Sequence, residues 1–178
     1  MAITINGTGT ITGISAGGLP DAIITQPELA AGVAGNGPAF SAYLGSNQSV
    51  SSGTFTKLQA NTEEFDTASC YDNATNYRFT PTVSGYYQIN GNIYINATAG
   101  VSNNNVCVIY KNGSRFKDGV LFSGVNGNLF YSTVNALIYF NGSTDYVELY
   151  ALATGTGTLT FGAGTTNSYF QGFLARAT

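Results

Sequence analysis

Asn-Gly turns between short runs of β-branched and aromatic residues restrict the fold of this chain more than any other feature. Asn112-Gly113 separates VCVIY from SRFKDGVLF, and Asn141-Gly142 separates FYSTVNALIYF from DYVELYAL. Two such runs around Asn-Gly predict a β-hairpin with a tight turn. From Phe55 onward we expect about eight to ten such strands and no helix, which is the strand number of a jelly roll. The predicted fold is therefore all-β, a two-sheet antiparallel jelly roll.

The predicted strands carry large side chains on both of their faces. In residues 136–140, Leu137 and Tyr139 point away from the face that would pack on a partner sheet. Tyr146 and Tyr150 lie on the corresponding outward face of the next strand. One face of each sheet packs on the other sheet, so a second aromatic face with few charges indicates contacts between subunits. A scatter of surface tyrosines, which needs no explanation, is the alternative. The predicted subunit contacts are Tyr139, Tyr146 and Tyr150.

The composition excludes several classes of function. Charged residues make up 8% of the chain, and the net charge is −3 with no basic run, which excludes the electrostatic footprint of a nucleic-acid binder. No apolar run approaches the roughly 18 residues of a membrane span, so no membrane insertion is expected. Without histidine, His-based catalytic triads and metal sites are excluded, and the adjacent Glu63 and Glu64 would point to opposite faces of a strand. We therefore predict that the chain is not an enzyme and binds no cofactor.

The first part of the chain differs in composition from the rest. Residues 1–47 carry only two charged residues, Asp21 and Glu28, and alternate isoleucine with threonine near the start. QPELAAGV (26–33) is the single helical candidate, but about two turns are marginal in isolation. We interpret residues 1–47 as an N-terminal attachment arm that becomes ordered against a partner, with a disordered tail as the alternative. Residues 48–178 are predicted to form the jelly-roll domain.

From Phe55 the sequence resembles the globular-head domain of complement C1q, a relative of the tumour necrosis factor fold. The positions that match the family's signature are Phe55, Asn61, Tyr71, Phe79, Gly85 and Tyr87. Ile89 replaces the usual phenylalanine, and Gly91 stands where an aromatic residue is normal. The resemblance implies a ten-stranded jelly roll assembled as a homotrimer, whose loops bind proteins, sugars or lipids. Some members bind calcium, but here the acidic residues are isolated and do not supply the six or so oxygens of a calcium site, so no metal is expected.

The opening segment, ITINGTGTITGISAGGLPD, resembles the start of many tailed-phage fibre and virion proteins, and RFTPTVSGYY resembles phage-encoded versions of the domain. The start also lacks the pattern of a signal peptide. We therefore predict a virion protein, assembled in the bacterial host cytoplasm and later extracellular, which contacts other virion proteins through residues 1–47. In that reducing compartment Cys70 and Cys107 are expected to stay unbridged.

A trimeric tail fibre or spike whose tip binds the host surface is the leading function. A trimeric head-decoration or head-fibre protein and a soluble C1q-like binding module are the alternatives. A depolymerase would need a carboxylate pair that the sequence does not place.

The order of long and short connections predicts which end of the domain binds. In an up-and-down succession of strands, the short turns fall at one end, and the longer connections (97–105, 123–128 and 153–167) gather at the other, away from the arm. These connections contain no charged residue, which suits a host cell-surface carbohydrate better than an ionic ligand, and long loops on a rigid scaffold often carry recognition. The candidate binding residues are Asn103, Asn104, Asn126, Asn128 and Phe161.

Overall fold

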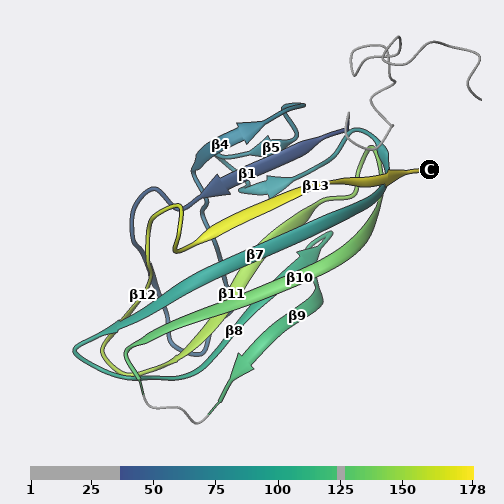
Figure 1. The fold of residues 1–178 in the computed structure, drawn as a ribbon. Helices are drawn as coiled ribbons and strands as arrows, with labels where there is room; N and C mark the ends of the chain where they lie inside the picture. The colour runs from purple at the N-terminus through teal and green to yellow at the C-terminus, as the bar shows by residue number, and fades with distance from the viewer. Residues whose placement is uncertain (1–36, 124–126) are drawn as a thin grey trace, which may run out of the picture.

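Two antiparallel sheets packed face to face make up the computed structural model, which describes residues 37–123 and 127–178 (Figure 1). The first sheet has seven strands: β1 (Ala39–Tyr43), β2 (Gln48–Val50), β4 (Thr62–Asp66), β7 (Ser84–Thr98), β10 (Leu129–Asn141), β12 (Thr158–Phe161) and β13 (Tyr169–Ala177). The second has six: β3 (Thr56–Lys57), β5 (Tyr71–Asp72), β6 (Arg78–Phe79), β8 (Ser102–Lys111), β9 (Ser114–Phe122) and β11 (Val147–Gly155). These described residues contain no helix, and so none that could cross a membrane. The predicted all-β jelly roll is confirmed.

Strand order shows how the two sheets are built. In the first sheet β7 pairs with β10 on one side and with both β12 and β13 on the other. Strand β12 also pairs with β2, β13 also pairs with β1, and β4 lies at the edge next to β1. In the second sheet β8 lies between β11 and β9. Each sheet therefore ends in a free edge strand on the side where β9 and β10 come together.

One of the two predicted hairpins forms. Asn112 and Gly113 have φ angles of 52° and 76°, the left-handed conformation that a two-residue hairpin loop requires, and they join β8 to β9. The second predicted hairpin is wrong, because β10 pairs with β7 along its whole length while β11 pairs with β8. The side chain of Asn141 accepts hydrogen bonds from three backbone N–H groups of the following turn, which carries the chain from one sheet to the other.

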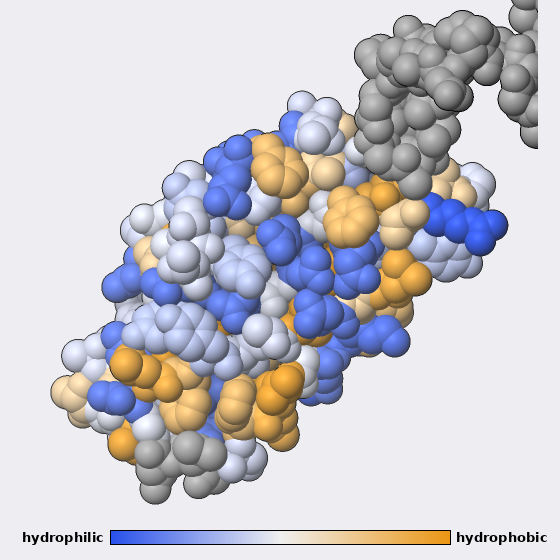
Figure 2. Space-filling model, viewed as in Figure 1, coloured by the Kyte–Doolittle hydropathy of each residue, from blue (hydrophilic) through white to orange (hydrophobic). Residues whose placement is uncertain are grey.

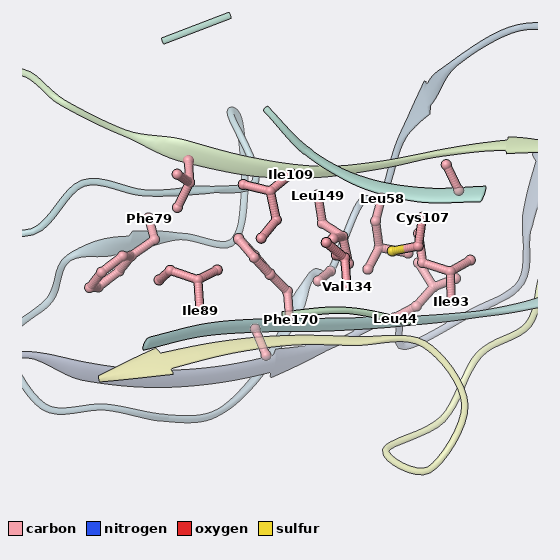
Figure 3. Close-up of a cluster of buried hydrophobic side chains, with 14 of the residues drawn as sticks. Leu44, Leu58, Phe79, Ile89, Ile93, Cys107, Ile109, Val134, Leu149 and Phe170 are labelled. Carbon is pink, nitrogen blue, oxygen red and sulfur yellow. The ribbon is translucent and has the colours of Figure 1, made fainter. Parts of the chain in front are cut away.

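Aromatic and aliphatic side chains fill the space between the sheets. Figure 3 shows Ile89 and Ile93 of one sheet facing Ile109 and Leu149 of the other, and all four are buried. Gly91 sits between them, and a Cβ there would lie 2.4 Å from a methyl group of Leu149. Leu149 therefore leaves no room for a larger side chain at position 91.

Three of the aromatic signature positions, together with Phe40, form a cluster at one end of the core. The ring of Phe40 stacks on Phe79 at 4.3 Å and on Tyr71 at 5.0 Å, and Tyr87 packs edge-on against Phe79 at 5.7 Å. All four rings are buried. Phe55, by contrast, lies outside this core, on the outer surface of the second sheet beside Tyr110.

The jelly roll starts earlier in the chain than residue 48. Strand β1 lies between β13 and β4, and its side chains Phe40 and Ala42, with Leu44 just after it, are buried. Because Phe40, Ala42 and Leu44 are buried in the core, the jelly roll includes residues that lie before the predicted boundary between 1–47 and 48–178. The proposed short helix at 26–33 lies outside the described residues.

Candidate functional site

The connections gather at two opposite ends of the sandwich, as the alternation of turns predicts. At one end the Thr156 amide donates to the Val101 carbonyl at 2.9 Å and the Ala97 amide donates to the Asn128 carbonyl at 2.8 Å. The Gly53 amide donates to the Ala153 carbonyl and the Ser52 hydroxyl donates to the Gly155 carbonyl, which adds a further segment there. We call this the distal end; it consists of residues 51–54, 98–104, 127–128 and 154–158.

The opposite, basal end holds the tight turns and both ends of the described chain. The Asn112 side chain donates to Asp145 at 2.8 Å, which links two turns. The Thr178 amide donates to the Ser84 carbonyl at 3.3 Å, and the Leu174 amide donates to the Pro38 carbonyl at 3.0 Å. In Figure 1 the C-terminus lies at this end, away from the connections of the distal end. The preceding part of the chain therefore joins the domain far from the distal end.

The distal end is polar but uncharged. Its residues are serine, threonine, asparagine, glycine, alanine and one valine, Val101, which is exposed. Hydroxyl and amide groups of this kind donate and accept hydrogen bonds without attracting ions over long distances. The arrangement suits a neutral polar ligand.

The structure brings together only some of the predicted binding residues. Asn128 is exposed at the distal end, whereas Asn103 and Asn104 lie half-buried at the start of β8. Asn126 lies outside the described residues. The assignment of Phe161 needs correction: its side chain is fully buried, because residues 158–161 form strand β12 between β7 and β2 instead of a loop.

A second candidate surface is the outer face of the first sheet, which is turned toward the viewer in Figures 1 and 2. Its large exposed residues, each at least 42% exposed, are Phe65, Tyr86, Leu129, Tyr131, Leu137, Tyr139 and Phe173; we call this surface the apolar face. Figure 2 shows hydrophobic patches separated by hydrophilic ones on this side of the molecule. A hollow of about 190 Å³ lies between Phe65 and Phe173, and another of about 300 Å³ lies beside Tyr86 and Leu137. Large exposed apolar areas of this kind mark interaction surfaces.

Strand β9 is a further exposed apolar element. Phe116, Val120 and Leu121 are 45%, 53% and 58% exposed, and the side chains of the strand are accessible on both of its faces. None of the predicted site residues lies on this strand, although SRFKDGVLF carries apolar residues on both of its faces. An edge strand with these residues is a natural surface for association.

The three tyrosines predicted as subunit contacts lie on different faces. Tyr139 belongs to the apolar face and packs edge-on against Tyr86 at 5.6 Å. Tyr146 and Tyr150 lie on the outer face of the second sheet, where Tyr150 stacks on Tyr110 at 4.0 Å. Burial there raises the pKa of Tyr150 to about 12. The three predicted subunit contacts therefore lie on two different sheets, and their role in a subunit interface stays a prediction.

A cation–carboxylate pair lies beneath the same tyrosine cluster. Lys57 binds Glu148 at 2.6 Å, and the Glu148 side chain is only 7% exposed. Lys57 also donates to the Asn76 carbonyl at 3.1 Å. These contacts fix strand β3 and the loop before β6 against the second sheet, which is a structural role.

Comparison with solved structures places this architecture among known folds. The globular domain of a zebrafish complement 1qA protein superposes with a TM-score of 0.53 and 14% identity, over 79% of this chain and 98% of that one. A crystal structure of murine APRIL at pH 5.0 gives a TM-score of 0.52 and 8% identity, over 76% of this chain and 96% of that one. The chain has the C1q and tumour necrosis factor jelly-roll fold. No protein-family model matches the sequence, and neither does any curated protein.

The candidate sites in the described residues are open surfaces. Across residues 37–123 and 127–178, no group of three metal-binding side chains comes together. The acidic residues of β4 lie at the edge of the first sheet, where burial and the nearby Asp66 raise the pKa of Glu63. The candidate functional surfaces are therefore the distal end, the apolar face and β9.

Proposed function

We propose that this chain is the subunit of a homotrimeric virion fibre or spike whose distal end binds a neutral glycan on the host cell. The jelly-roll fold supports a binding module, and the resemblance to the C1q domain implies the trimer. The resemblance of residues 3–21 to tailed-phage fibre proteins supports the virion role. The observation that carries the proposal is the uncharged polar distal end, which lies opposite the point where the preceding chain enters.

The trimer is proposed to form by contact of β9 of one subunit with the apolar face of the next. These two surfaces are different, so each contact is heterologous, and three such contacts can close a ring. Acidic residues Glu63 and Glu64 lie on β4 at the margin of the apolar face, and β9 offers the basic Lys117, whereas Arg115 on the same strand is paired with Asp118 at 2.6 Å. Burial of the exposed rings and aliphatic chains on both surfaces supplies the driving force.

The distal end would then face the host while the basal end faces the particle. Substituting Thr98→Ala, Val101→Ser and Asn128→Ala removes exposed groups of the distal end. Adsorption of particles that carry this variant should fall by about tenfold or more, the equivalent of losing one or two net hydrogen bonds. Thr82→Ala with Ser114→Ala changes exposed residues of the basal end and is the matched control.

Salt and location give further tests of the proposal. Adsorption should change little between low and moderate salt, because the distal end carries no charge to screen. Adsorption that collapses with salt, or wild-type adsorption by the distal variant, would contradict glycan binding at this end. Gold-labelled antibody on particle heads instead of tails would reassign the protein to head decoration.

A further inference from the structure

A row of amide side chains crosses the apolar face. Strand register places Gln171 of β13 opposite Asn90 of β7, and Asn90 opposite Asn135 of β10. Ser41 of β1 continues the row next to Gln171, and its hydroxyl donates to Glu64 at 2.7 Å. We call Asn90, Asn135 and Gln171 the amide row.

Exposed aromatic and aliphatic side chains lie beyond the amide row in both directions. Toward the basal end, the next register position carries Phe173 and Leu137 on either side of Gln88. Toward the distal end, the next position carries Tyr169, Asn92 and Thr133, and the position beyond it carries Tyr94 and the exposed Tyr131, whose ring centroids are 4.9 Å apart. The row therefore belongs to a polar strip between two groups of exposed apolar residues.

The amides retain unused hydrogen-bonding capacity within the subunit. Gln88 donates to the Asn90 side chain at 3.1 Å. In the part of the chain that the structure describes, the side chains of Asn135 and Gln171 make no hydrogen bond. Asn90 and Gln171 also line the hollow between Phe65 and Phe173. A partner that covers this face without pairing the amides would leave buried donors and acceptors unsatisfied, which is costly.

A second copy of this chain fits this surface better than an apolar partner does. The chain itself supplies exposed aliphatic and aromatic groups on β9, together with the basic Lys117, which complements the acidic margin of the face. Among the described strands β9 pairs with β8 alone, so its other edge presents backbone N–H and C=O groups. Those groups can donate to and accept from amide side chains, whereas a lipid surface cannot.

We propose that the amide row fixes the register of the subunit interface. Apolar contacts alone tolerate sliding and alternative stoichiometries, whereas one set of buried amides must meet its partners in a single alignment. The row thereby limits association to one oligomer at some cost in interface stability. This inference rests on the proposed homotrimer.

The test is the triple variant Asn90→Leu, Asn135→Leu, Gln171→Leu, examined by native mass spectrometry and sedimentation velocity beside the wild type. The variant should still associate but should give at least two oligomeric species in place of one. Thr133→Val adds an apolar group on the same face outside the row and should leave the single species unchanged. If the triple variant precipitates, Asn135→Leu alone, at an exposed position, should show a second species.

The outcomes separate the inference from the trimer itself. A wild-type trimer whose amide-row variants remain one trimeric species would overturn the register role and leave the proposed trimer intact. A wild-type monomer would overturn the trimer and the inference together. Mixed stoichiometry in the amide variants, with a single species in the wild type and in Thr133→Val, supports the inference.

Discussion

Replacing Ser132 with alanine should destabilise the domain through a single hydroxyl group. Ser132 is fully buried on β10, where the two sheets approach each other. Its hydroxyl accepts a hydrogen bond from the Cys107 amide at 2.8 Å and donates one to the Val120 carbonyl at 3.0 Å. A register irregularity between β8 and β9 at Val106 and Val108 diverts the Cys107 amide from the ladder, so the serine provides its partner.

The cost of the substitution follows from the two groups left without a partner. An unsatisfied buried donor or acceptor costs about 1–3 kcal/mol. The Cys107 amide lies on a fully buried residue and should bear that cost, whereas Val120 is 53% exposed, so water can reach its neighbourhood. We therefore expect a loss of about 2–4 kcal/mol in the free energy of unfolding, dominated by the amide.

Urea unfolding at one fixed protein concentration, monitored by circular dichroism, measures this loss, because the stability of an oligomer depends on concentration. Ser49→Ala makes the same chemical change at an exposed position of β2 and should shift the free energy by less than about 0.5 kcal/mol. A Ser132→Ala loss as small as that of the control would refute the reasoning. It would mean that the Cys107 amide finds another partner.

Three other predictions concern a glycine, a carboxylate and the thiols. Gly119→Ala should prevent folding, since its Cβ would lie 1.9 Å from a backbone oxygen of β10. A Cβ at Gly53 meets no neighbour within 4 Å, so Gly53→Ala should lower stability far less. Soluble yield and circular dichroism of the two variants test this difference. Backbone N–H groups of the following turn lower the pKa of Asp72 from 3.8 to about 2. The ionised carboxylate therefore stabilises the folded state above about pH 4, and this contribution is lost as pH falls toward 2. Asp72→Ala should flatten that part of the stability–pH curve in acid titrations. Both cysteines are free and buried, and burial raises the pKa of the Cys107 thiol, so iodoacetamide should label it only after unfolding; rapid labelling of the native protein would contradict this.

Local patterns predicted which side chains face the core, because alternation along a strand is a property of the strand itself. Tyr87, Ile89, Ile93 and Ile95 occupy alternate positions of β7, and all four are buried. The turn at Asn112-Gly113 likewise depends on two adjacent residues with positive φ. Features decided within a few residues of each other were therefore readable from the sequence.

Features decided by contacts far apart in the chain were not readable in the same way. The turn after Asn141 was recognised, but the pairing of β10 with β7 depends on a strand more than forty residues earlier. Phe161 lies in a stretch rich in glycine and threonine that is typical of a loop, yet pairing on both sides makes it a buried strand. The alternation of side chains along the strand also predicted that Tyr150 points away from the core, but it did not reveal which sheet contains that strand. Surface assignments therefore required the three-dimensional arrangement.

The mass of the purified protein in solution tests the central claim most directly. Sedimentation equilibrium at micromolar concentration should give three times the 18.5 kDa subunit mass. Leu137→Asp on the apolar face and Val120→Asp on β9 should each dissociate the assembly, because each places a charge in the proposed contact between exposed apolar groups. A wild-type mass of 18.5 kDa, or a trimer that survives both substitutions, would contradict the account.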